Sequence, residues 1–172
     1  MNTRSAIESD ISDIYDLHQK VAQSSGGIAR NVTEISLEYI YEIFSETKAS
    51  GIMLVGIHPE TNQIIAEMHA TKYGLQLFNH ILTNLTIVVH PDYQAQGFGK
   101  KIFQAFLKLI KENYPEIGRV ELESRAKNLK SINLYTSLGF YQEGIMKNKT
   151  HNADGTFEDS ILMAWFNPTY KF

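Results

Sequence analysis

The sequence lacks cysteine and shows no strong excess of charge of either sign. Without a thiol, the chain has no disulfide, no thiolate-bound metal and no cysteine nucleophile. Its 172 residues carry 16 Lys and Arg against 19 Asp and Glu, which gives a net charge of −3. That balance does not supply the positive field on which generic nucleic-acid binding depends, so we expect no nucleic-acid partner.

Long apolar runs and paired histidines are also missing. No hydrophobic stretch reaches the roughly 18 residues of a membrane-spanning helix, and residues 1–10 show no apolar signal-peptide core. We therefore expect a cytoplasmic protein without a membrane partner. The six histidines include no His-x-x-x-His pair, so no metal site is predicted.

Hydrophobic periodicity predicts a chain of mixed helices and strands. Ser9 and Asp10 precede the first helical stripe, where their side chains can accept hydrogen bonds from the amides of the first turn. Helices are expected at residues 10–23, 36–49, 99–113 and 131–138. Strands are expected at residues 3–6, 52–57, 63–73, 82–90, 119–124, 140–147 and 157–166.

The order of these elements indicates one α+β domain that spans residues 1–172. It combines antiparallel neighbours with one crossover between parallel strands, and no repeat, linker or low-complexity tract interrupts it. The loop Ser24–Gly27 between the first two helices is a candidate lid or wall of a substrate site. Glu67 and His69 share one face of a strand by strict alternation, and both are candidates for contact with a substrate.

The most informative segment runs from Val88 to Lys100. A β-branched strand leads through a turn that contains Gly97 and Gly99 into a strongly amphipathic helix. Backbone amides at such a helix start favour an anion, and glycines allow a ligand to approach closely, so a phosphate or pyrophosphate is expected there. The segment is not a P-loop, because no Gly-Lys-Ser or Gly-Lys-Thr ends it, and it lacks the first glycine of the dinucleotide fingerprint.

The remaining pattern, Gln-x-x-Gly-x-Gly at residues 94–99, resembles the acetyl-coenzyme A motif of the GNAT superfamily of N-acetyltransferases. Residues 128–140, with Asn followed by Leu-Tyr-x-x-x-Gly-Phe, are similar to a second segment of that family. Residues 122–128 are closest to ribosomal-protein alanine N-acetyltransferases, whereas residues 85–91 look more like broad-specificity small-molecule members. The resemblance covers most of residues 3–166, in family order.

The resemblance implies a GNAT fold, with a mixed, mostly antiparallel twisted sheet of about seven strands flanked by about four helices. It implies an enzyme with acetyl-coenzyme A as co-substrate and no metal, which acetylates a primary amine directly. The acceptor is then an amino acid, a peptide or protein N-terminus, or another small amine. The implied cofactor-binding residues are Ile87, Val88, Val89, Gln94, Ala95, Gln96, Gly97, Phe98, Gly99, Lys100, Asn128 and Tyr135.

Tyr135 and Glu123 are the catalytic candidates. In the family context, the Tyr135 hydroxyl protonates the departing thiolate, and Glu123 takes the amine proton directly or through a water. The alternative for Tyr135 is a core aromatic residue. The alternative for Glu123 is one member of a solvated Arg and Glu face, since alternation places Arg119, Glu121, Glu123 and Arg125 together.

The acceptor and the assembly are less constrained by the sequence. Deprotonating a lysine amine of pKa about 10.4 at pH 7 costs about 4.6 kcal/mol, against about 1 kcal/mol for an α-amine near 7.8, which favours an α-amine. A homodimer is a possible assembly, given the aromatic tail Trp165–Phe172. Two other functions stay open, namely a non-catalytic acyl-coenzyme A sensor and a nucleotide-phosphate binder that uses the same glycine turn.

Overall fold

The computed structural model describes residues 1–24, 28–152 and 154–172. Most of the predicted lid, residues 25–27, therefore lies outside the described residues. The helices are α1 (Ile11–Gln23), α2 (Leu37–Ser50), α3 (Phe98–Asn113) and α4 (Leu129–Ser137). The strands are β1 (Asn2–Ser5), β2 (Gly51–Ile57), β3 (Ile64–Lys72), β4 (Ile81–Val89), β5 (Arg119–Arg125), β6 (Tyr141–His151) and β7 (Phe157–Phe166).

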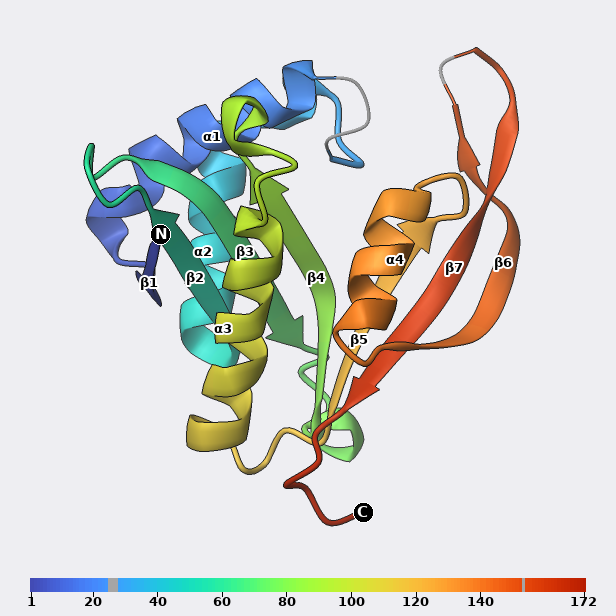
Figure 1. Ribbon diagram of the computed structural model, residues 1–172. Helices are drawn as coiled ribbons and strands as arrows, with labels where there is room; N and C mark the ends of the chain where they lie inside the picture. The colour runs from blue at the N-terminus through green and yellow to red at the C-terminus, as the bar shows by residue number, and fades with distance from the viewer. Residues whose placement is uncertain (25–27, 153) are drawn as a thin grey trace. The chain divides into compact units, whose positions relative to one another are not determined.

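The strands form one mixed sheet in the order β1-β2-β3-β4-β5-β7-β6 (Figure 1). Pairing is antiparallel between β1 and β2, β2 and β3, β5 and β7, and β6 and β7. The β4 and β5 strands run parallel, with Ile81 opposite Arg119 and Leu82 opposite Val120. The predicted α+β class, with seven strands and four helices, is confirmed.

Two compact units make up the chain. Unit 1 consists of Met1–Thr71 and Thr86–Leu109, and unit 2 of Lys72–Leu85 and Ile110–Phe172. Unit 1 contains α1, α2, β1, β2 and most of β3, together with the glycine turn. Unit 2 contains α4 and strands β5 to β7. The prediction of a single domain stays a prediction.

The core of unit 1 comes from the apolar stripes that the sequence predicts. Helices α1 and α2 bury one face against β2 and β3, and Ile14, Leu17 and Ile40 are among the buried residues of this cluster. The stripe predicted for α3 is buried as well, at Ile102, Phe103, Phe106 and Leu107 in unit 1 and at Ile110, where unit 2 begins. Burial of such side chains contributes about 1.5–3 kcal/mol each, which fixes the helices against the strands.

The prediction that Asp10 caps α1 through its side chain is wrong. Asp10 does occupy the residue before the helix, but it makes no side-chain cap bond. Its carboxylate instead accepts two bonds from the Arg4 guanidinium, at 2.6 and 2.8 Å, and one from the Ile7 amide. An arginine fork satisfies both carboxylate oxygens better than a single amide can. The Arg4 guanidinium accordingly lowers the pKa of Asp10.

Unit 2 confirms the alternation predicted for the strand at residues 119–124. In β5, Val120, Leu122 and Ser124 are buried, whereas Glu123 is exposed. The predicted strand at residues 157–166 coincides with β7. The β6 strand extends beyond its predicted end, because Thr150 and His151 pair with β7 after an irregularity in the register. In the described residues, no helix has both the length and the apolar character needed to cross a membrane.

Candidate functional site

The glycine turn of unit 1 begins where β4 ends. A short helical turn, Pro91–Tyr93, follows the strand, and α3 begins at Phe98. Between them, Ala95 and Gly97 have positive φ angles of 59° and 82°. Positive and negative φ angles that alternate along a chain turn successive amides toward one side, which creates a concave surface for an anion.

The amides of residues 95–100 have no hydrogen-bond acceptor in the described part of the chain. The first bond at the start of α3 runs from the Lys101 amide to the Gly97 carbonyl, at 3.0 Å. Residues 94–97 are exposed. The turn therefore presents unpaired donors to solvent at the positive end of a long helix, and this arrangement fits a diphosphate.

The side chains of Gln94 and Gln96 bind the turn itself. Nε2 of Gln94 donates to the Val89 carbonyl at 3.0 Å, and Nε2 of Gln96 donates to the Asp92 carbonyl at 2.8 Å. Both bonds connect the turn to the residues that precede it. The family resemblance implies that these glutamines bind the cofactor, which stays a prediction, and the sequence gave no sign of this supporting role.

The two glycines of the turn differ in the atoms that a side chain at each position would meet. A Cβ on Gly97 would meet no atom within 4 Å, so the positive φ is what favours glycine there. A Cβ on Gly99 would lie 3.6 Å from Val89 Cγ2, which is an ordinary contact. A side chain at either position would therefore meet no close contact from the described residues.

The β4 segment predicted to bind the pantetheine arm lies in the same unit. Val88 is 1% exposed and belongs to the core under α1 and α2. Ile87 and Val89 are half-buried, and both approach Gly99 at the start of α3. The backbone continues next to β3, since the His90 amide donates to the Ile65 carbonyl at 2.9 Å.

Unit 2 contains Asn128, Tyr135 and Glu123. Asn128 directly precedes α4, and its Oδ1 accepts the Ser131 amide at 3.2 Å, while its Nδ2 has no partner in the described residues. Next to it, the Lys127 amide donates to Oε1 of Glu158 at 2.7 Å. Glu158 is buried, and the sequence analysis missed this residue because it lies far along the chain from Lys127.

Tyr135 is buried in α4, with 8% of its surface exposed. Its ring centroid lies 6.1 Å from that of Phe140. Burial raises the pKa of the Tyr135 hydroxyl, and a hydrogen bond with Ser131 partly offsets that rise. The hydroxyl is therefore kept protonated, as a proton donor must be.

Glu123 lies on the charged face of β5, opposite Leu162 of β7. Arg119 on the same face donates to Glu121 at 3.0 Å and to Glu143 at 2.8 Å. The Glu143 carboxylate raises the pKa of Arg119 and has its own pKa lowered in return. Glu123 forms no such bond with any described residue. Arg119, Glu121 and Glu143 thus form a partly solvated network of charges. Such a solvated face is the alternative that the sequence leaves open for Glu123.

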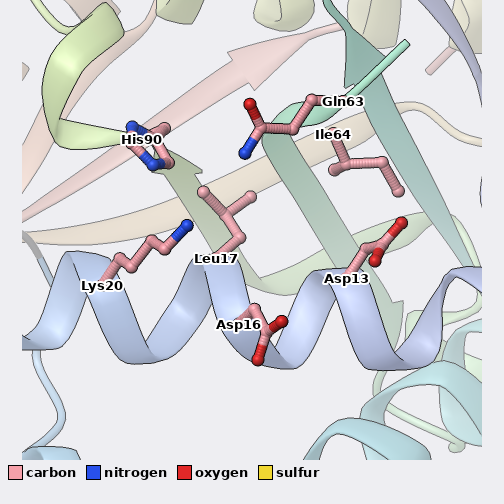
Figure 2. A pocket seen from close by; sticks show the side chains of 7 residues that line it. All are labelled: Asp13, Asp16, Leu17, Lys20, Gln63, Ile64 and His90. Atoms are coloured by element: carbon pink, nitrogen blue, oxygen red, sulfur yellow. The ribbon is translucent and has the colours of Figure 1, made fainter. Parts of the chain in front are cut away.

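A small polar pocket in unit 1 lies between α1 and the starts of β3 and the glycine turn (Figure 2). Its volume is about 90 Å³, and Figure 2 shows that its lining residues are Asp13, Asp16, Leu17, Lys20, Gln63, Ile64 and His90. Burial lowers the pKa of His90, and the charge of Lys20 adds to this effect. Cofactor pockets usually measure about 300–1,000 Å³, so this pocket is too small for a coenzyme.

Three comparisons connect the chain to known proteins. The model of the acetyltransferase (GNAT) family matches residues 13–140. The ribosomal protein bS18-alanine N-acetyltransferase of Escherichia coli (strain K12) is 38% identical over 82 residues, which are 48% of this chain and 53% of that protein. The chain thus spans about half the length of the curated relatives it matches.

Solved structures share the fold across the whole chain. The acetyltransferase of the GNAT family from Streptococcus pneumoniae superposes with a TM-score of 0.86 at 19% identity, covering 96% of this chain and 98% of that one. The yncA structure from Salmonella typhimurium, solved with its cofactor acetyl-CoA, gives 0.85 at 17% identity and covers 100% and 96%. In the described residues, no group of three or more His, Asp or Glu side chains is arranged to hold a metal ion.

Proposed function

The chain belongs to the acetyltransferase (GNAT) family, and from this premise we propose that it transfers an acetyl group from acetyl-coenzyme A to a primary amine. The observation that carries the proposal is the row of unpaired amides at residues 95–100. They form a concave surface of donors at a helix start, of the kind that binds the phosphates of nucleotide cofactors. The proposal fits the yncA relative, whose structure contains acetyl-CoA.

We propose a role in coenzyme binding for each of the residues that the resemblance implies. The amides of residues 95–100 would hold its diphosphate, and Lys100 would add positive charge. The backbone of residues 87–89 would bind the pantetheine arm, and Nδ2 of Asn128 would donate to one of its amides. When bound, the coenzyme supplies an acetyl group activated as a thioester.

Proton transfer would complete the reaction. Tyr135, buried and protonated, would donate a proton to the departing thiolate. The proton that the amine loses needs an acceptor, and the family resemblance assigns this role to Glu123. A base with this task typically accelerates the reaction about 10²–10⁴-fold.

We propose an α-amine as the acceptor. The relative from Escherichia coli is named for acetylating an alanine of a ribosomal protein. An α-amine also loses its proton more readily than a lysine side chain, by about 3 to 4 kcal/mol at neutral pH. A cytoplasmic location and a possible homodimer belong to the same proposal, the second because Tyr141 and Phe172 are exposed aromatic residues of unit 2.

The experiment replaces Gly97 with Asp. A carboxylate at the unpaired amides repels the diphosphate, and we expect the KM for acetyl-coenzyme A to rise about 100-fold, which corresponds to about 2.7 kcal/mol. Gly155→Asp is the matched control. Gly155 has the same φ of 82° and equally open surroundings, but it lies in the β6–β7 hairpin. Both variants carry the same backbone strain, and only Gly97→Asp should affect the coenzyme.

Thermal unfolding with and without coenzyme A gives an independent measurement of binding. Coenzyme A should raise the melting temperature of the natural protein and of Gly155→Asp, because a ligand of the folded state stabilises it. Thiol release with a panel of N-terminal peptides, amino acids and polyamines then measures turnover. Binding without turnover on any amine would identify an acyl-coenzyme A sensor, and stabilisation by ATP alone would identify a nucleotide binder.

A further inference from the structure

Unit 1 contains a buried cluster of three titratable side chains that the family resemblance does not use. His18 comes from α1, and Glu67 and His69 come from β3. One oxygen of Glu67 lies 2.9 Å from Nε2 of His18, and the other lies 2.8 Å from Nδ1 of His69. We call these residues the His-Glu-His cluster. It connects the first helix to a central strand through one carboxylate.

Glu67 is the ionised centre of the cluster. Complete burial alone would raise the pKa of Glu67, but the charge and hydrogen bonds of His69 and His18 outweigh burial and hold it at about 2. An ionised carboxylate only accepts hydrogen bonds, so both facing ring nitrogens must carry a proton. The bonds therefore fix the ring orientation of both histidines.

The two histidines differ in the surroundings of the ring nitrogen that does not face Glu67. Nδ1 of His18 is buried and has no hydrogen-bond partner. Its side chain is 0% exposed, whereas that of His69 is 5% exposed. His69 is buried as well, but it is the member of the cluster whose side chain is not fully covered. In its neutral form, with the proton on Nδ1, its Nε2 carries a lone pair that can accept a proton.

His69 lies on β3, the neighbour of the strand that is expected to bind the coenzyme. The His90 amide donates to the Ile65 carbonyl, and β4 returns next to β3 in the opposite direction (Figure 1). Ile65 is thus bonded to the residue that follows β4, and Glu67 and His69 lie two and four residues further along β3. These two residues of the cluster therefore lie on the strand next to β4.

Few other charged groups face the cluster from the elements packed on it. From α2, the ring of Tyr39 lies 6.4 Å from that of His18, and the Arg30 guanidinium stacks 4.1 Å above Tyr39. Burial raises the pKa of the Tyr39 hydroxyl, which stays neutral. On β2, the residues opposite Glu67 and His69 are Val55 and Met53, which do not titrate. Glu67 is therefore the charged side chain in direct contact with the His69 ring.

We propose that His69, in place of the Glu123 that the family resemblance suggests, accepts the proton that the acceptor amine loses, with Glu67 and His18 as positioning residues. The proposal rests on the proposed acetyl transfer. The nitrogen–carbon bond forms as the carbon–sulfur bond of the thioester breaks. The amine proton goes to Nε2 of His69, and the thiolate takes a proton from Tyr135. Glu67 stabilises the imidazolium that results, as a buried carboxylate does when it holds a histidine base.

The first test needs neither substrate nor coenzyme. Nuclear magnetic resonance of the free protein with labelled histidine reports which ring nitrogen carries the proton. We expect His69 with its proton on Nδ1 and His18 with its proton on Nε2. The same measurement on Glu67→Gln should show a change at both rings. A neutral His69 with its proton on Nε2 would overturn the proposal, because that nitrogen could not act as a base.

The second test compares two matched substitutions. His69→Asn places an amide nitrogen near the position of Nδ1 and keeps a donor to Glu67, but it removes Nε2. His18→Gln keeps a donor near the position of Nε2 and removes only the unpartnered Nδ1. Each variant loses one imidazole and retains one bond to the carboxylate. We expect kcat to fall about 100-fold or more for His69→Asn, and a few-fold at most for His18→Gln.

The pH profile separates proton transfer from a purely structural role. The acid limb of the kcat profile reports protonation of the catalytic base, so replacing that base removes the limb. Loss of that limb in His69→Asn, measured with the same amine, supports the proposal. An unchanged limb in His69→Asn together with its loss in Glu123→Gln would overturn it. If either variant fails to fold, His69→Gln provides a second comparison.

Failure of this inference is distinguishable from failure of the proposed function. A natural protein that binds coenzyme A and acetylates an amine, while His69→Asn retains its rate and profile, contradicts the role of His69 alone. A natural protein that releases no thiol with any amine contradicts the acetyl transfer, and the role of His69 with it.

Discussion

Two groups of polar atoms in unit 1 have opposite surroundings. The amides of residues 95–100 have no acceptor in the described chain, and residues 95–97 and 100 are exposed. The carboxylate of Glu67 is completely buried, and each of its oxygens has an imidazole partner. The first group has positive partial charge and no partner, whereas the second is a negative charge whose two oxygens both have hydrogen-bond partners within the chain.

The difference in burial shows which of the two groups is free to bind a ligand. An exposed amide without a protein partner is satisfied by water, so a bound anion can replace that water at little cost. A buried carboxylate has no such option and is stable only with its partners in place. The turn can therefore be empty or occupied, while the His-Glu-His cluster must stay intact for the fold.

The largest effect is expected from removal of the buried charge of Glu67. Glu67→Gln should lower the free energy of unfolding at pH 7 by about 3 kcal/mol, since one amide cannot accept from both rings. The pKa of Glu67 drops on folding from about 4.5 to about 2. The stability that Glu67 adds is therefore present above pH 4.5 and is lost as the pH falls toward 2.

Chemical denaturation at pH 7 and at pH 3 checks this prediction. The difference between Glu67→Gln and the natural protein should be smaller at pH 3. Glu42→Gln, which changes an exposed acid on α2, is the control and should stay within about 0.5 kcal/mol of the natural protein. A difference for Glu67→Gln that does not depend on pH would mean that its charge contributes nothing.

The elements could be predicted from the sequence because their apolar patterns are local. The strand at residues 119–124 alternates throughout its length, and the buried stripe of α3 repeats at helical spacing. The start of α4 was placed at residue 131, but the helix begins at Leu129, because Asn128 supplies its cap. The open turn was predictable as well, since its glycines form a contiguous pattern.

Contacts between distant residues could not be predicted. His18 and Glu67 are 49 residues apart, and neither residue's neighbours in the sequence point to a partner. The same is true of Glu158, which accepts the Lys127 amide. Alternation did indicate that Glu67 and His69 share a face, but not that the carboxylate is fully buried, because burial depends on how α1 packs on β3.

A smaller effect is expected from Asn128, whose side chain caps the start of α4. Asn128→Ala removes the bond to the Ser131 amide and should cost about 1 kcal/mol of stability. Asn128→Ser restores a cap, since serine and asparagine are similarly good at this position. If Nδ2 of Asn128 also binds the coenzyme, the serine variant regains stability but keeps a raised KM. Denaturation and kinetics of the two variants separate the roles, and recovery of both properties in the serine variant would limit Asn128 to capping.

The smallest effect is expected from Lys100, at the exposed edge of the open turn. Its charge adds to that of the amides, but water and salt screen an exposed charge strongly. We expect Lys100→Ala to raise the KM for acetyl-coenzyme A about threefold at low ionic strength, with little difference at about 1 M salt. Lys111→Ala, an exposed lysine in the last turn of α3, is the control and should leave the KM unchanged. Because the amides carry most of the binding, a loss for Lys100→Ala as large as that for Gly97→Asp would show that a side chain, and not the backbone, holds the diphosphate.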